Sequence, residues 1–287
     1  MVGRGNLSWF RSQCARDDRA SRIAGQRRIG IGGGLRTLAL TLVAIFGIVT
    51  GARATDFYEL QIYSVDTVPQ DHVMVELHTN SVTSGTGELA SSNLPLYQIH
   101  NTIEVTYGLL PYLEVGQYIC TARLNAGTYE YAGGRSKVHF GIPGTESWPI
   151  SFGANIEFQY MRREAVSDPL NIEFMPIAQM ELGRLTAIAN LSFEKQFSGP
   201  GTHQGIGLEP MGQISYRILH WFEPSLEYYG DIGPVQAPVP MYQQQQFIVP
   251  SVNLYLDPRF EFNFGVGFGT TRAWQGRFVK ATIGWLL

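Results

Sequence analysis

The chain has 287 residues, which is enough for one large domain or two small ones, and 16% of them are charged. An ordinary soluble domain has about 25% charged residues, while no apolar run here reaches the ~18 residues of a transmembrane helix. Hydropathy therefore gives no support to membrane-spanning helices, and any case for a membrane protein must rest on alternating strands.

The first 54 residues have the pattern of a secretory signal. Residues 1–36 contain eight arginines and two acidic residues, residues 38–49 are largely apolar, and Ala-Arg-Ala at 52–54 fits the small-x-small cleavage rule. These three features together are typical of a signal peptide. We therefore predict that residues 1–54 are removed and that the mature domain is 55–287. A single membrane anchor is the alternative, for which the apolar core is short.

Cleavage would change the charge of the protein. It removes nine of the 21 basic and two of the 24 acidic residues, so the mature chain has a net charge of −10. Such a chain is a poor binder of nucleic acid, and we predict no nucleic-acid partner. Cys120 is the single cysteine of the mature chain, so it cannot form an internal disulfide.

The mature chain alternates between apolar and polar residues with the period of a β-strand. In 259–269, five large apolar residues lie on one face, and two polar residues and three glycines on the other. Segments 150–161, 170–181 and 185–195 repeat the pattern, with Ile188 as an exception. A soluble sandwich also alternates, but here the polar face is poor in lysine and the apolar face has Tyr or Trp near its ends. These two faces are typical of a lumen and a lipid-facing wall.

We predict an all-β fold: an antiparallel up-and-down transmembrane β-barrel of about twelve strands, in which Cys120 is a small wall residue. The predicted strands are 72–79, 99–107, 112–121, 135–143, 150–161, 170–181, 185–195, 206–218, 221–230, 246–256, 259–269 and 277–287. The connections then alternate between long and short, as external loops and periplasmic turns do in outer-membrane barrels. The predicted long connections are 80–98, 122–134, 162–169, 196–205, 231–245 and 270–276. Residues 57–65 are either a further short strand or an N-terminal plug.

The last predicted strand, 277–287, has an apolar face that includes Trp285 and Leu287. A C-terminal amphipathic strand, usually with an aromatic at its end, resembles the signal that the outer-membrane assembly machinery recognises. Here leucine is terminal and the aromatic lies two residues earlier. The resemblance implies that this machinery and outer-membrane lipid are partners of the chain in a Gram-negative bacterium.

Three groups of short motifs carry a second resemblance. They are Tyr-Gly at 107–108 with Leu-Glu-Val-Gly at 113–116, Glu-Tyr-Tyr-Gly-Asp-Ile-Gly at 227–233, and Phe-Gly-Val-Gly-Phe-Gly at 264–269. They resemble a loosely defined family of Gram-negative outer-membrane barrels that is sometimes grouped with transporters for aromatic-compound catabolism. The resemblance implies an outer-membrane barrel with a transport function, but it hardly narrows the substrate.

The predicted lumen face is rich in carboxylates. Its eleven acidic residues are Glu76, Glu104, Glu114, Glu157, Glu173, Glu181, Glu194, Glu209, Glu223, Glu227 and Glu261, beside three basic ones, His139, Arg217 and Lys280. Charges inside a barrel must be paired or hydrated. The face therefore indicates either a water-filled, cation-preferring path for small solutes or a closed structural barrel with a polar core. Twelve strands lie between the eight that leave no pore and the sixteen that leave a channel.

Other candidate sites are weaker. The glycines at 265, 267 and 269 either widen the lumen or allow close backbone approach. His72, Glu76 and His78 lie on one strand face, but positions six apart are about 20 Å from each other, which is too far for one metal ion. We predict no enzyme, metal or cofactor, because no His-x-Ser pair and no Gly-x-Ser-x-Gly motif occurs. A lipid-modifying barrel enzyme is the third hypothesis, after a channel and a closed barrel.

Overall fold

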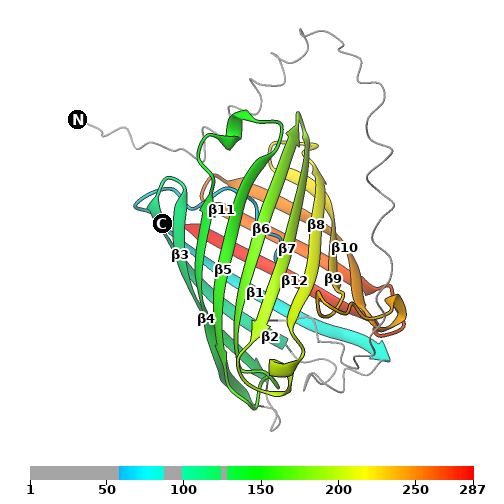
Figure 1. Cartoon of the computed structure of the whole chain (residues 1–287). Coiled ribbons are helices and arrows are strands. Elements are labelled where there is room, and N and C mark those ends of the chain that lie inside the picture. The colour runs from blue at the N-terminus through cyan, green and yellow to red at the C-terminus, as the bar shows by residue number, and fades with distance from the viewer. Residues whose placement is uncertain (1–57, 87–98, 124–127) are drawn as a thin grey trace, which may run out of the picture.

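The computed structural model describes residues 58–86, 99–123 and 128–287, so the predicted signal segment lies outside the described residues. Twelve antiparallel strands close into one barrel (Figure 1). The strands are β1 (Val73–Thr86), β2 (Ile99–Leu110), β3 (Leu113–Arg123), β4 (Tyr129–Gly141), β5 (Ser151–Met161), β6 (Leu170–Leu182), β7 (Leu185–Gln196), β8 (Ile206–Tyr216), β9 (Phe222–Asp231), β10 (Gln245–Asp257), β11 (Phe260–Gly269) and β12 (Gln275–Leu286). Three short 3-10 helices are η2 (Thr145–Ser147), η3 (Pro200–His203) and η4 (Met241–Gln243).

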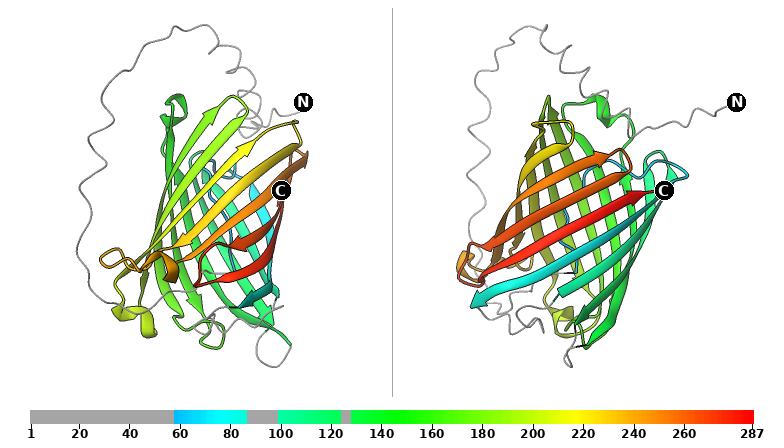
Figure 2. Two further views of the ribbon diagram at one scale, coloured as in Figure 1. Left: turned by 90° about the vertical axis from the view of Figure 1, so that its right-hand side faces the viewer. Right: turned by 180° about the vertical axis from the view of Figure 1, so that it is seen from behind.

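Each strand pairs with the next along the chain, and the last strand pairs with the first (Figure 2). The closing ladder between β1 and β12 runs from Met74 opposite Leu286 to Thr86 opposite Gln275. Because closure leaves no edge strand, every strand of the barrel is paired on both sides. The predicted fold and the number of strands are confirmed.

The two largest differences from the predicted strand boundaries are at the end of β1 and the start of β4. β1 continues to Thr86, and β4 begins at Tyr129, whereas the sequence predicted loops over 80–98 and 122–134. The Gly-Gly pair at 133–134 is typical of a loop, but here it marks a bulge where the β3–β4 register shifts. Gly133 has φ 145°, and a Cβ there would lie 2.5 Å from the Cα of Met161. The pair therefore bends a strand that continues through it.

The outer surface is apolar over all strands. Its exposed side chains include Ile103, Ile119, Phe158, Phe174, Leu191, Ile214, Leu226, Ile248, Phe264 and Ile283. Exposed aromatic residues lie near the strand ends, among them Tyr107, Tyr112, Tyr129, Tyr131, Tyr216, Trp221 and Trp285. A soluble protein rarely exposes an apolar area of this extent, while a lipid-facing belt between two aromatic girdles requires it. Among the described residues, no helix is long and apolar enough to span a membrane.

The connections at one end of the barrel are short, such as the turn at 183–184 and the link at 258–259. At the other end they include the stretches 162–169 and 232–244. The difference in length between the connections at the two ends is smaller than the sequence predicted. At the end with short turns, the connection 142–150 is long enough to contain η2, and at the other end β4 begins soon after β3 ends. Which end faces the periplasm stays a prediction.

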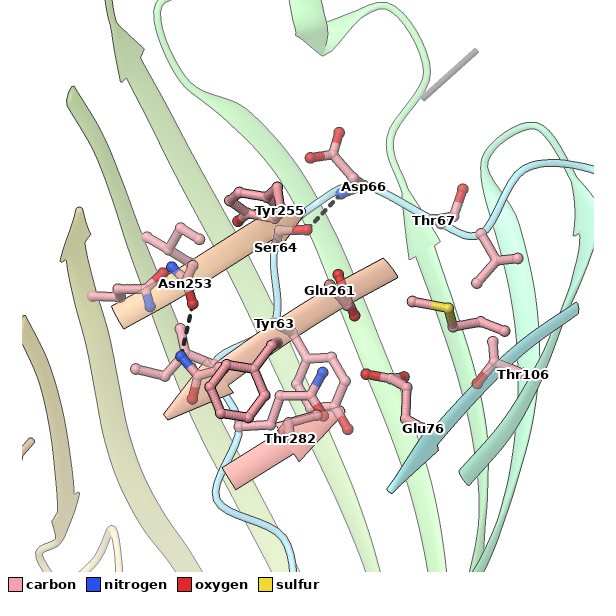
Figure 3. A pocket seen from close by; sticks show the side chains of 18 of the residues that line it. Tyr63, Ser64, Asp66, Thr67, Glu76, Thr106, Asn253, Tyr255, Glu261 and Thr282 are labelled. Carbon is pink, nitrogen blue, oxygen red and sulfur yellow. Dashed lines mark hydrogen bonds between the residues drawn. The ribbon is translucent and has the colours of Figure 1, made fainter. Parts of the chain in front are cut away.

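Residues 58–72 form no strand. The segment runs through the interior of the barrel and joins β1 at the end with the short turns (Figures 2 and 3). At that end the amide of Asp71 donates to the carbonyl of Gly108 (2.8 Å), and the amide of Gly108 donates to the carbonyl of His72 (3.0 Å). Of the two alternatives for the region around 57–65, the structure has the N-terminal plug.

Candidate functional site: the occupied barrel lumen

Residues 58–72 occupy the lumen, and we call them the plug segment. Three of its large side chains are almost fully enclosed: Tyr58, Leu60 and Tyr63 are 2%, 3% and 5% exposed. Tyr58 packs with Cys120 of β3 and other small wall residues, while Leu60 packs with Phe247 of β10. The segment thus touches opposite parts of the wall within three residues.

Side chains of the wall satisfy the backbone of the plug segment. The hydroxyl of Thr102 donates to the carbonyl of Tyr58 (2.8 Å), and the ammonium of Lys280 donates to the carbonyl of Leu60 (3.0 Å). Asn190 both accepts from the amide of Tyr63 (2.7 Å) and donates to its carbonyl (2.9 Å). Buried backbone groups without partners are costly, so these bonds hold the segment without any strand pairing.

The same pattern continues toward the exit. The amide of Val65 donates to Oε1 of Gln179 (3.1 Å), and the amide of Val68 donates to Oε2 of Glu114 (2.5 Å). Gly141 of the wall lies directly against Val65, because a Cβ there would be 2.6 Å from the Val65 carbonyl oxygen. The wall is therefore shaped for this segment, in polar contacts and in close approach.

A first charged cluster surrounds Glu59 of the plug segment. The guanidinium of Arg135 on β4 contacts Oε2 of Glu59 (3.1 Å) and Oε2 of Glu157 on β5 (3.4 Å). The hydroxyl of Tyr63 donates to Glu157 (2.9 Å) and lies 2.8 Å from that of Tyr118. All these groups are buried, so the cluster joins plug and wall by interactions that water screens little.

A second cluster lies on the opposite wall. The ammonium of Lys280 on β12 contacts Oε2 of Glu227 on β9 (2.6 Å) and the hydroxyl of Tyr229 (2.9 Å). Glu227 also accepts from the hydroxyls of Tyr229 and Ser251, both at 2.7 Å. Lys280 and Glu227 are 4% and 1% exposed. Here three strands and the plug segment meet at one ion pair.

A third cluster lies across β1–β4. The ammonium of Lys137 contacts Oε1 of Glu104 (2.5 Å) and Oε1 of Glu114 (3.1 Å). The other oxygen of Glu104 lies 3.1 Å from Nε2 of His78. Glu76, on the same face of β1 as His78, is also buried. Carboxylates outnumber the cationic side chains in this part of the lumen.

Two cavities remain beside the plug segment. The larger, of about 280 Å³, opens between residues 60–69 and the wall and is bordered by Glu76, Glu261 and Arg217. Figure 3 shows Tyr63, Glu76 and Glu261 pointing into this cavity. The smaller, of about 50 Å³, lies between the plug segment and β4–β9, next to Glu173 and Glu209. Residues 60, 61 and 63 of the plug segment border both cavities.

Part of the interior is apolar, which the sequence analysis did not predict. Phe247, Trp274 and Phe278 are fully buried, with ring centroids 4.6 to 6.0 Å apart. Phe247 meets the other two rings edge to face, while the rings of Trp274 and Phe278 are tilted by 39°. The glycine ladder of β11 lies beneath them: a Cβ on Gly267 would be 2.1 Å from the Phe278 ring, and one on Gly269 would be 2.8 Å from the Trp274 ring. The glycines therefore serve close packing rather than a wider lumen.

The structure places the predicted site residues as follows. Buried on the inner face are Glu76, Glu104, Glu114, His139, Glu157, Glu223, Glu227 and Lys280, and half-buried are Glu173, Glu181, Glu194, Glu209, Arg217 and Glu261. Arg217 pairs with Glu223 (2.7 Å), while Glu194 accepts from Asn171 and Gln196. His72 is not brought to Glu76 and His78; its ring contacts the carbonyl of Gln70 instead. That these residues line a conducting pore stays a prediction.

Arg135 and Lys137 were missed, and with them the count of three basic residues on the inner face was wrong. Both are buried in the lumen beside His139, 6% and 4% exposed. The signal was present, because alternate residues of a strand share a face and 135, 137 and 139 differ by two. Glu59 had no such signal, since it belongs to no strand.

The chain folds into a closed antiparallel β-barrel of twelve strands whose lumen is occupied by its own N-terminal segment. No family model matches the sequence, and no curated protein matches it. Solved structures do: the COG4313 outer membrane channel from Pseudomonas putida F1 has a TM-score of 0.54 at 7% identity, over 80% of this chain and 100% of that one. The KdgM porin has a TM-score of 0.51 at 8% identity, over 74% of this chain and 98% of that one. The chain thus has the fold of porin-like outer-membrane barrels.

Proposed function

We propose that the protein is a channel of the Gram-negative outer membrane that its own plug segment closes at rest. The observation that carries the proposal is how the plug segment is held. It is bonded through wall side chains instead of being a strand of the sheet. Such a segment can leave without breaking any ladder of the barrel.

The wall remains paired after the plug segment has left. Lys280 would lose the carbonyl of Leu60 but keep Glu227 and Tyr229. Arg135 would lose Glu59 but keep Glu157. Because an unpaired buried charge is expensive, a wall that satisfies its own charges makes an open state accessible. A barrel whose plug supplied the essential counter-charges could not open in this way.

The open lumen would prefer cations. The inner face has the eleven predicted carboxylates, and its Lys and Arg residues include Arg135, Lys137, Arg217 and Lys280, beside the histidines His78, His100 and His139. The excess of carboxylates gives a negative potential that concentrates cations and repels anions. We propose small solutes as cargo, without naming one. The link to aromatic-compound catabolism stays an expectation from the sequence resemblance.

Secretion and membrane insertion belong to the same proposal. Residues 1–54 act as a signal peptide, so that the mature chain begins at Thr55, three residues before Tyr58. The C-terminal strand 277–287 is the segment that the assembly machinery recognises, and outer-membrane lipid surrounds the barrel. The pairing of β12 with β1, which closes the barrel, supports the role of this strand in assembly.

A cysteine lock tests the channel. Tyr58 packs against Cys120, and the cross-strand neighbour of Cys120, Thr102, donates to the Tyr58 carbonyl. In Tyr58→Cys the new thiol should form a disulfide with Cys120 and fix the plug segment to the wall. We expect single-channel openings in planar bilayers for the reduced protein and none for the oxidised one. Tyr58→Cys with Cys120→Ala is the matched control and should be insensitive to oxidation.

A closed structural barrel is the second candidate function, because the plug segment occupies the lumen and borders both of the cavities described. The two candidates differ in one result. Deletion of residues 58–66 from a closed structural barrel creates a permanent pore, whereas the intact protein never conducts. Conductance of the intact, reduced protein with cation-selective reversal potentials supports the channel. If the intact protein shows no conductance at any voltage while the deletion variant conducts, the result supports the structural barrel.

A further inference from the structure

Glu76 and His78 of β1 and Glu104 of β2 converge in the lumen. One ligand atom from each lies within 4.8 Å of the other two. The three side chains are 6%, 1% and 0% exposed. Glu76 and Glu104 are directly opposite each other in the β1–β2 ladder, and His78 is the next residue on the same face of β1. The convergence is thus built from the register of two paired strands.

The orientation of His78 resembles that of a metal ligand. Its Nε2 lies 3.1 Å from Oε2 of Glu104, and its Nδ1 lies 3.4 Å from the hydroxyl of Thr282 on β12. Two ligands on one tetrahedral ion, with bonds of about 2.0–2.1 Å, are about 3.3 Å apart. Metal-bound histidines typically donate from the second ring nitrogen to an oxygen, which fixes the ring. Thr282 is placed for that role.

The surroundings of the Glu76 carboxylate also favour a bound cation. Among the described residues, no nitrogen donor is bonded to its carboxylate, and its hydrogen-bonding neighbour is another carboxyl group, that of Glu261. Two carboxylates in contact repel each other unless a proton or a cation lies between them. Glu76 points into the larger cavity, so solvent ions can reach it (Figure 3).

The charges of the surroundings leave room for a divalent cation. Four carboxylates face this region, Glu76, Glu104, Glu114 and Glu261, and Lys137 is the ammonium among them. Lys137 is bound to Oε1 of Glu104 and to Glu114, which leaves Oε2 of Glu104 and the carboxylate of Glu76 for an ion. The cluster therefore has an excess of negative charge even with Lys137 in place.

We propose that Glu76, His78 and Glu104 bind one divalent first-row transition-metal ion, with Glu261 as a neighbouring carboxylate and Thr282 as the residue that orients His78. An imidazole ligand favours such ions over Ca²⁺ and Mg²⁺, which take oxygen ligands. The site depends on the barrel alone, so it stands whether or not the barrel conducts.

Titration of Co²⁺ into the refolded mature protein tests the site. Visible absorption reports the ligand field of the ion, and equilibrium dialysis reports its stoichiometry. We expect one Co²⁺ per chain, displaced by Zn²⁺ and not by Ca²⁺. His78→Gln and Glu76→Gln should each abolish the absorption. Thr282→Ala removes only the orienting hydroxyl and should weaken binding by about 10- to 100-fold.

His139→Gln is the matched control, because His139 is also a buried lumen histidine but lies outside the cluster. It should bind Co²⁺ like the unmodified chain. Thr282→Ala keeps every charge, so it gives a result even if the substitutions at 76 and 78 prevent refolding. Absence of bound Co²⁺ would overturn the proposal. So would binding that His78→Gln leaves intact, or that His139→Gln weakens as much as His78→Gln does.

Discussion

Substitution of Lys280 by methionine measures how much the barrel depends on the ion pair in its interior. Methionine keeps the length of the side chain but removes all three hydrogen bonds of the ammonium group, to Glu227, Tyr229 and the carbonyl of Leu60. Glu227, 1% exposed, then stays as a buried carboxylate without a counter-charge. Loss of one partner of a buried pair costs about 3–5 kcal/mol. The hydroxyls of Tyr229 and Ser251 still donate to Glu227, so we expect the lower end of this range.

The double variant separates charge burial from packing. In Glu227→Gln with Lys280→Met neither charge of this pair remains, so the loss of unfolding free energy should be about 1–2 kcal/mol smaller than the sum of the two single losses. Urea unfolding of the refolded protein in lipid vesicles, followed by tryptophan fluorescence, measures each value. Arg162→Met is the control, because its partners Glu130 and Glu164 are solvent-exposed and such pairs contribute little. Additive effects of the two single substitutions would refute the reasoning.

Three further predictions concern packing, topology and processing. Gly267→Ala should cost about 1–3 kcal/mol of unfolding free energy in the same urea assay, because its Cβ would lie 2.1 Å from an aromatic ring, whereas Gly212→Ala, with its nearest neighbour at 3.3 Å, should cost less. An epitope tag within 233–246 should be labelled on intact cells, and a tag at 257–258 should not; the reverse pattern would overturn the orientation. N-terminal sequencing of membrane-extracted protein should begin at Thr55, and a protein that keeps residues 38–49 would be anchored instead.

The case of β4 shows where local patterns succeed and where they fail. The alternation of Arg135, Lys137 and His139 on one face is a local property, but the sequence analysis assigned only His139 to the lumen, with the strand predicted to begin at 135 after a loop over 122–134. The start of the strand was not local. Gly-Gly at 133–134 predicts a loop by itself, but pairing with Met161 and Tyr160 on β5 continues the strand through a bulge. A neighbouring strand thus decided the boundary.

The cluster of Phe247, Trp274 and Phe278 also depends on contacts between elements that are distant in the sequence. Phe278 alternates with Lys280 on the inner face, so its direction follows from the sequence. What it meets there does not, because Phe247 and Trp274 come from other elements and Leu60 from the plug segment. The sequence analysis predicted a polar inner face, rich in carboxylates. The closed barrel places an apolar layer within it, where residues that are distant in the sequence exclude water together.

By itself the sequence determined the number of strands, their antiparallel order and the face of nearly every wall residue, because a strand repeats every two residues and a lipid-facing wall must be apolar at alternate positions. Only the tertiary structure decided what fills the lumen. The contact of Lys280 with Leu60 joins residues 220 positions apart, and that of Asn190 with Tyr63 joins residues 127 apart. Such contacts depend on how the strands tilt and stagger when the barrel closes. No periodicity of a single segment contains that information.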